Sequence, residues 1–211
     1  LITRLMFTWF LRQKNIVPHA IFDHEVLSGI IKEFKSGSMI QDSYYRCILQ
    51  NLFFATFNCP PEKRSFMPRS YHGRNSGHNV KTLYRYEKEF VDSAVFKDEI
   101  MARIPFLNCA LFDCLDKKER EQDGGREYYW DGFSDHPQKR AHLPNGLFFD
   151  DQKGILPLFN SYEFTIDENN ADDCDIALDP ELLGKVFENL LSAFNPETSE
   201  TARKATGSFY T

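Results

Sequence analysis

The segment Gly207-Ser208-Phe209-Tyr210-Thr211 places two aromatic side chains close to a glycine. Phenylalanine and tyrosine offer apolar surface to a flat ring, and glycine lets a ligand approach the backbone closely. These residue types could therefore line a pocket for a nucleotide. The alternative is a chain end that binds nothing, because terminal residues are commonly poorly ordered. Composition alone favours this second interpretation.

A second group of residues could bind a phosphate backbone. Residues 59–88 contain seven basic and two acidic side chains, interleaved with aromatic residues and glycines. Lysine and arginine neutralise phosphates, and exposed rings can stack on bases. The alternative is a solvated surface loop whose charges pair with one another, which is the commoner case. The candidate DNA contacts are Lys63, Arg64, Arg69, Arg74, Lys81 and Arg85.

Motifs for catalysis are missing from the chain. It contains no glycine-rich dinucleotide loop, P-loop, nucleophile elbow or zinc-protease motif. Asp23 with Glu33 and Lys35 has the residue types of a Mg²⁺ nuclease site, but periodicity places the last two on a helix rather than a strand. The five cysteines form no C-x-x-C pair, which favours reduced thiols over zinc ligands. We therefore expect no catalytic or metal site in the chain itself.

Apolar residues at helical spacing predict the elements that would position these groups. We expect helices at 1–14, 24–34, 43–57, 87–103 and 180–194, with Asp23 or His24 starting the second and Asp179 capping the last. The third is apolar on nearly every side, which is typical of a helix at the centre of a core. Residues 105–160 look irregular, and two short strands are predicted at Leu147–Phe149 and Glu163–Ile166. The Tyr128-Tyr129-Trp130 cluster favours core packing, with base stacking as the alternative.

Composition indicates a folded, water-soluble protein. The chain has 211 residues, 42% of them hydrophobic and 15% aromatic, enough for one sizeable core. Its net charge is −6, divided as +4 over residues 1–100 and −10 over residues 101–211. A domain that binds nucleic acid over its whole surface would be basic, so any DNA contact should be local. We expect a cytoplasmic protein with no membrane partner, and the absence of an initial methionine suggests part of a longer chain.

Several motifs resemble one family. Arg203-Lys204 followed by Thr206-Gly207-Ser208-Phe209-Tyr210-Thr211 is similar to the R-K-x-T-G-S-F-Y-T-P segment of adenine-specific DNA methyltransferases, in particular the fused type IIG-like restriction–modification enzymes. The preceding helix, DPELLGKVFENLL, resembles the helix that leads into that segment. Upstream, Tyr44-Tyr45-Arg46 with Leu49-Gln50-Asn51-Leu52-Phe53-Phe54 resembles YYR…LQNLFFATLN. The segment Ile104-Pro105-Phe106-Leu107-Asn108, with Leu111-Phe112, resembles IPFLNGGLF, although Cys109-Ala110 replaces the glycine pair.

The resemblance implies N6 methylation of adenine in double-stranded DNA by the parent protein, with S-adenosylmethionine as cofactor. The residues it implies at the cofactor are Gly207, Phe209, Tyr210 and Thr211. Some relatives carry a nuclease domain, which would need Mg²⁺. The implied fold is mainly α: a helical, bundle-like connector over residues 1–196, with a long irregular segment and two short strands, then a linker and the start of the cofactor motif at 197–211. Its partners would be the flanking nuclease and methyltransferase domains.

Two other functions are compatible with the residues alone. One is an autonomous DNA-binding module that uses residues 59–88. The other is a protein-interaction scaffold, suggested by the acidic second half of the chain. In every case we expect the 211-residue chain by itself to bind S-adenosylmethionine negligibly and to be inactive, because no glycine-rich cofactor loop is present.

Overall fold

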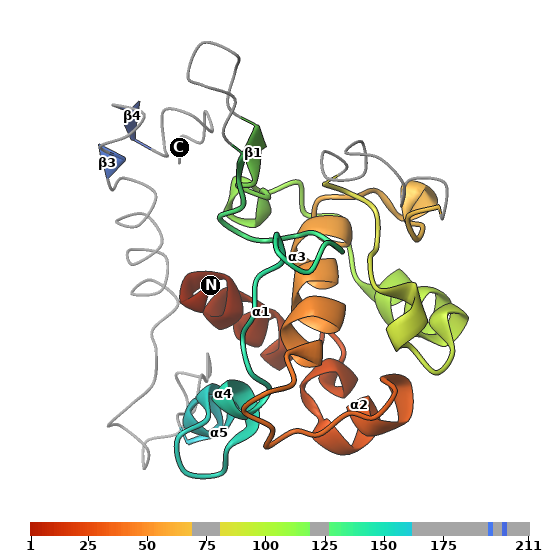
Figure 1. The fold of residues 1–211 in the computed structure, drawn as a ribbon, viewed down its shortest axis with the longest axis vertical. Helices are drawn as coiled ribbons and strands as arrows, with labels where there is room; N and C mark the ends of the chain where they lie inside the picture. Colours follow the sequence, from red (N-terminus) through yellow and green to blue (C-terminus); the bar gives the residue numbers. More distant parts are fainter. Residues whose placement is uncertain (69–80, 119–126, 162–193, 196–199, 202–211) are drawn as a thin grey trace. The chain divides into compact units, whose positions relative to one another are not determined.

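The computed structural model describes residues 1–68, 81–118, 127–161, 194–195 and 200–201. These residues are mainly helical, as predicted (Figure 1). The chain divides into two units, Leu1–Phe159 and Asn160–Thr211. Most of the second unit lies outside the described residues, including residues 180–193 of the predicted helix, the predicted strand at Glu163–Ile166 and the predicted boundary at 196. Those three stay predictions.

The helix α1 (Ile2–Gln13) confirms the first predicted helix. Leu5 and Trp9 from the predicted apolar face are buried, but Ile2 is exposed. Arg4, which periodicity places away from the core, is buried as well. The helix ends where Asn15 adopts a left-handed conformation with φ 56°, which asparagine tolerates better than most residues.

The third predicted helix is confirmed as the most buried element. It comprises the π-helical η2 (Tyr44–Gln50) and α3 (Asn51–Ala55), which Figure 1 shows as one continuous orange helix. Every residue of both segments is buried. Its polar side chains reach other segments: Asn51 accepts from the backbone N–H of Arg85 and donates to its carbonyl, at 2.9 and 3.0 Å. A helix with no solvent-facing side is therefore held by polar contacts to segments that surround it.

The second helix is shorter than predicted. After η1 (His19–Phe22), α2 covers only His24–Ile30, and Asp23 caps it by accepting from the amides of Glu25 and Val26. The chain then becomes extended because it pairs with a distant segment. The backbone N–H of Lys32 donates to the carbonyl of Glu89, and that of Val91 donates to the carbonyl of Ile30. This pairing between distant segments overrides the helical periodicity that continues through Phe34.

The fourth helix begins later than predicted. The short 3₁₀ turn η6 (Glu87–Glu89) is separate, and the helix proper consists of η7 (Val95–Ile100) and η8 (Met101–Arg103). Asp92 accepts a hydrogen bond from the amide of Ala94 at 2.8 Å, which is the geometry of a cap. Residues 87–91 instead pair with the segment after α2.

Residues 105–160 are less irregular than predicted. After η3 (Pro61–Lys63) and η9 (Ala110–Phe112), the chain forms the antiparallel pair β1 (Lys117–Lys118) and β2 (Glu127–Tyr128). Two helices follow, α4 (Gly146–Phe149) and α5 (Ile155–Asn160). The predicted strand at Leu147–Phe149 is therefore wrong. The remaining pair, β3 (Phe194–Asn195) with β4 (Glu200–Thr201), belongs to the second unit.

Asn145 explains why the apolar run after it is helical. The backbone N–H groups of Asn145 and Gly146 donate to the backbone carbonyls of Gln41 and Ser38, respectively. The side-chain oxygen of Asn145 accepts a hydrogen bond from the backbone N–H of Tyr44 at 2.9 Å. Because this residue ties the start of α4 to the start of η2, the run begins in a backbone conformation that a strand would not permit. These partners lie about a hundred positions away, beyond the reach of a local pattern.

The aromatic residues form clusters that build the core of the first unit. Edge-on and tilted ring pairs of this kind are favourable beyond their buried area. One cluster joins α1 and α3 to η9 through Phe7, Phe53, Phe57 and Phe112. A second consists of Phe66, Tyr84, Phe90 and Phe96. A third joins η2 to α4 through Tyr44, Phe148 and Phe149.

Candidate nucleic-acid interface

The six candidate DNA contacts are not one surface. Lys63 is exposed at the end of η3. Lys81 is half-buried, and its Nζ donates to the carbonyl of Cys114 at 2.6 Å. Arg69 and Arg74 lie outside the described residues. Of the six, the described part of the chain therefore offers Lys63 fully and Lys81 in part to solvent.

Arg64 is a buried structural residue, which corrects its prediction as a DNA contact. The residue is 8% exposed, and its guanidinium donates to four backbone carbonyls. The acceptors, at 2.8–2.9 Å, are those of Thr56, Cys59, Met101 and Ile104. Three of its nitrogens are thus used at the ends of the helices α3 and η8. A positive charge held in this way is not available to a phosphate.

Arg85 is also buried, and its prediction as a DNA contact is likewise wrong. It is 2% exposed, and its guanidinium carbon lies 4.3 Å from the ring centroid of Phe133. Burial lowers the pKa of this guanidinium, since removing a cation from water disfavours its charged form. Charge counting along the sequence does not distinguish such arginines from solvated ones.

The Tyr128-Tyr129-Trp130 cluster is not the core element that we expected. Trp130 is 59% exposed and Tyr128 is 40% exposed, while Tyr129 is half-buried with Lys139 Nζ 5.1 Å from its ring centroid. The core prediction is therefore wrong for Trp130. Tyr128 ends the two-residue strand β2, and Tyr129 and Trp130 follow it outside any strand.

The segment that follows α3 contacts the segment around residues 104–112. Asn58, next to the end of the 44–57 helix, accepts from the amide of Cys109 at 3.0 Å and donates to its carbonyl at 3.2 Å. The amides of Leu107 and Asn108 both donate to the carbonyl of Phe57. The segment around residues 104–112 is thus docked on the helix end through its backbone.

The turn at Cys109-Ala110 has ordinary backbone conformations. Cys109 has φ −113°, and Ala110 begins the 3₁₀ turn η9. Neither conformation requires glycine. The left-handed position falls one residue earlier, at Asn108, with φ 48°. Cys109 and Ala110 therefore introduce no backbone strain at the turn.

Sequence reasoning missed a charged cluster on the N-terminal side of η2. The carboxylate of Asp42 is 5% exposed and lies 2.6 Å from Arg46 Nε and 2.7 Å from His142 Nδ1. Burial acts to raise the pKa of Asp42, but the hydrogen bonds from His142 and Arg46 outweigh it and hold that pKa below its usual value. The i,i+4 spacing of Asp42 and Arg46 was the available signal; nothing in the sequence indicates His142.

Asp116 and Asp131 form a second group that the sequence did not reveal. Asp116 accepts hydrogen bonds from the amides of Asp131, Gly132 and Phe133 at 2.8–2.9 Å. Asp131 binds Arg4 and the amide of Leu115. These carboxylates fix the chain around β1 and β2, and their partners come from three separate segments.

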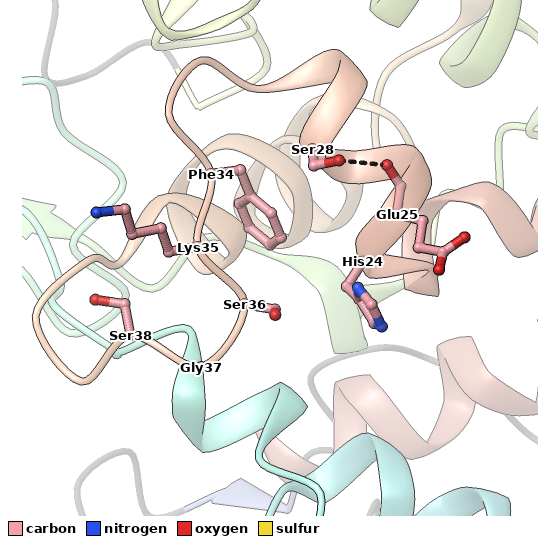
Figure 2. Close-up of a pocket in the computed structure, with 8 residues that line it drawn as sticks. All are labelled: His24, Glu25, Ser28, Phe34, Lys35, Ser36, Gly37 and Ser38. Carbon is pink, nitrogen blue, oxygen red and sulfur yellow. Dashed lines mark hydrogen bonds between the residues drawn. The ribbon is translucent and has the colours of Figure 1, made fainter.

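An open cavity of about 530 Å³ lies between α2 and the loop that follows it (Figure 2). Figure 2 shows His24 and Glu25 across from Phe34 and the loop of Ser36 and Gly37. Ser28 donates to the carbonyl of Glu25 at 2.6 Å rather than to a base, so its hydroxyl is not arranged as an activated nucleophile. The lining residues are His24, Glu25, Ser28, Phe34, Lys35, Ser36, Gly37 and Ser38.

The nuclease-like residues beside this cavity are not assembled. Glu33 has φ 54° and lies in a turn, not on the predicted helix. The carboxylate of Asp23 is used to cap α2. Within the residues that the structure describes, no group of three or more His, Cys, Asp or Glu side chains could hold a metal ion. The cofactor residues Gly207, Phe209, Tyr210 and Thr211 lie outside the described part of the chain.

In the same part of the chain, every helix is too short or too polar to cross a lipid bilayer. Comparisons of the chain with known protein families, with curated proteins and with solved structures found no match.

Proposed function

We propose that this chain is the helical connector of an adenine-specific DNA methyltransferase of the restriction–modification type, and that it positions an S-adenosylmethionine-dependent catalytic domain on DNA. The proposal starts from the four segments that resemble that family. Its bundle-like helices would join the methyltransferase domain to a nuclease domain where one is present. The catalytic groups, the cofactor and any Mg²⁺ would belong to those neighbours.

The contact between Asn58 and Cys109 is the observation that carries the proposal. Here the YYR…LQNLFF-like helix and the IPFLN-like segment are joined by four hydrogen bonds at Phe57 and Asn58. Backbone docking of this kind holds a turn rigidly against a buried helix, which suits a domain whose role is to fix the placement of another.

The buried arginines weigh against the alternative of an autonomous DNA-binding module. That function needs solvated cations along residues 59–88. Arg64 and Arg85, two of the six candidates, are instead enclosed by protein. The remaining candidates would provide at most a local contact to the DNA backbone, as expected of a connector.

The test is methyl transfer by the intact protein that contains this chain. That protein is incubated with labelled S-adenosylmethionine and unmethylated duplex DNA, and the DNA is digested to nucleosides. We expect label in N6-methyladenine only. Label in no nucleoside, from a folded protein that does bind S-adenosylmethionine, would overturn the proposal.

A variant tests the positioning role separately. Asn58→Ala removes the side chain that holds Cys109, so we expect methylation by the intact protein to fall by about tenfold or more, since small misplacements of a catalytic group are costly. Cofactor affinity should not change. Ser28→Ala, which removes a local hydrogen bond on exposed α2, is the matched control and should retain full activity.

A further inference from the structure

The β1–β2 hairpin presents an exposed aromatic face. The register pairs Lys117 with Tyr128. Leu115 lies two residues before β1, and Trp130 lies two residues after Tyr128, the last residue of β2. The exposed fractions of Leu115, Tyr128 and Trp130 are 48%, 40% and 59%. Large apolar side chains gathered in this way commonly mark a binding site. These three residues are called the aromatic face below.

The base of the hairpin is held rigidly. Trp130 directly precedes Asp131, whose amide donates to Asp116 and whose carboxylate accepts from Arg4 and from the amide of Leu115. The rings of Tyr128 and Trp130 lie with centroids 6.4 Å apart and planes inclined by 58°. Because the backbone on both sides of Trp130 is fixed, its indole is presented to solvent with little backbone freedom left to lose on binding.

Lys81 supplies a cation beside the hairpin. Three nearby carboxylates are engaged: Asp131 by Arg4, Asp116 by three backbone amides, and Asp113 by the side-chain amide of Asn58 at 2.9 Å. Lys81 is anchored at the carbonyl of Cys114, one residue before Leu115. Aromatic side chains beside lysines are the combination that binds single-stranded nucleic acid.

We propose that the aromatic face stacks on unpaired bases of DNA, with the Trp130 indole as the principal platform and Lys81 close to the phosphates. The choice of DNA rests on the proposed function, whereas the stacking chemistry rests on the geometry of the hairpin. An indole on a rigid support stacks on any base because every base has a flat π surface. The site therefore reads an unpaired or extruded base and not a sequence.

Tryptophan fluorescence tests this directly, because the chain has two tryptophans and only Trp130 is exposed, Trp9 being 1% exposed. We titrate the chain with an oligothymidine of about 16 nucleotides, a length within the usual range of single-strand sites. Stacking should quench the Trp130 emission and protect it from acrylamide. In Trp130→Phe, the remaining Trp9 emission should not respond to DNA.

Affinity measurements with variants complete the test. Trp130→Ala should weaken oligothymidine binding by about tenfold, while Trp130→Phe, which keeps a ring, should lose less. Ile40→Ala, at an apolar side chain that is 84% exposed on another loop, is the matched control and should bind normally. A fully paired duplex should quench Trp130 little, because its bases already stack on one another.

Several results would overturn the proposal. These are no binding of oligothymidine, equal affinity of Trp130→Ala and the unaltered chain, or equal quenching by duplex. Protection of Trp130 that rises with protein concentration without DNA would instead identify a contact between copies of the chain. The two proposals can be refuted separately. If the parent protein methylates DNA but Trp130 emission does not respond to DNA, only the stacking site is refuted. If Trp130 is quenched but the parent protein does not methylate DNA, only the methyltransferase function is refuted.

Discussion

Arg4 on α1 and Asp131 after β2 form a buried ion pair, with Nη1 2.6 Å from Oδ1, across 127 positions of sequence. The same guanidinium donates to the carbonyls of Leu111 and Asp113 at 2.7 and 2.8 Å. One side chain thus joins the first helix to both sides of the β1–β2 hairpin. The pair has the additional hydrogen bonds that a buried charge requires.

We expect single substitutions in this pair to be severe. Asp131→Asn leaves the Arg4 charge buried without its partner, and should lower the free energy of unfolding by about 3–5 kcal/mol. Arg4→Met leaves the opposite charge uncompensated and should cost a similar amount. The double variant should lose less than the two singles together, with a coupling of about 1–3 kcal/mol. Urea unfolding of all four proteins measures this coupling, and strictly additive losses would show that the pair does not interact energetically.

Local patterns predicted the elements whose stability is itself local. The apolar spacing of Leu5 and Trp9 is present in α1, and α2 begins at His24, in agreement with the predicted start at Asp23 or His24. The 43–57 helix was found because it is apolar on nearly all sides. In each case the information lies within one or two turns of the residue concerned.

The failures concern residues whose partners are remote. Arg64 and Arg85 resemble solvated cations in sequence, but backbone carbonyls and the ring of Phe133 enclose them. The local pattern of Leu147–Phe149 predicts a strand, but hydrogen bonds of Asn145 with Gln41 and Tyr44 start a helix there. Trp130 reads as core because large aromatics usually are. No local pattern carries the position of a partner fifty or a hundred residues away.

Arg64 should be needed for folding and not for DNA binding. Its four hydrogen bonds satisfy carbonyls at two helix ends, and unsatisfied buried groups are costly. Arg64→Ala should lower the free energy of unfolding by about 3–4 kcal/mol. Arg64→Lys should lose somewhat less, because an ammonium cannot reproduce the planar fork.

Lys63→Ala is the matched control for Arg64, since Lys63 is the neighbouring exposed cation. It should change the free energy of unfolding by no more than about 0.5 kcal/mol. Both variants are compared by urea unfolding. An Arg64→Ala protein as stable as the Lys63→Ala protein would mean that the four hydrogen bonds contribute nothing net.

The described cysteines should differ sharply in reactivity. Cys109 is half-buried, whereas Cys47, Cys59 and Cys114 are buried. Burial raises the pKa of the Cys114 thiol to about 12 and raises that of Cys47 further, so both are protonated near neutral pH. Because the thiolate is the reactive form, we expect iodoacetamide to label Cys109 at least about tenfold faster than Cys47.

Peptide mapping by mass spectrometry reads the labelling at each cysteine. Unfolding in urea is the internal control and should bring the rates together, since burial alone separates them. Fast labelling of Cys47 in the folded protein, at a rate equal to that of Cys109, would contradict the burial of η2 at the centre of the core.

Asp42 should make the stability of the fold sensitive to acid. Its pKa is lowered in the folded state because the hydrogen bonds from His142 and Arg46 outweigh the opposing effect of burial. Its unfolded value is about 3.9. A carboxylate with a lowered folded pKa stabilises the fold above its unfolded pKa, and this contribution disappears as the pH falls through the folded pKa. The free energy of unfolding should therefore drop below about pH 4.

Asp42→Asn isolates this contribution. The amide cannot titrate, so the variant should be less stable near neutral pH and should show a shallower loss of stability below about pH 4. Asp98→Asn, at an exposed side chain on η7, is the control and should follow the unaltered chain closely. Urea unfolding of the three proteins across the acid range measures the slopes. A lowered folded pKa makes the unfolded chain bind more protons than the folded one in this range. If the unfolding free energy of Asp42→Asn has the same slope against pH as that of the unaltered chain, Asp42 is not held as an anion by His142 and Arg46.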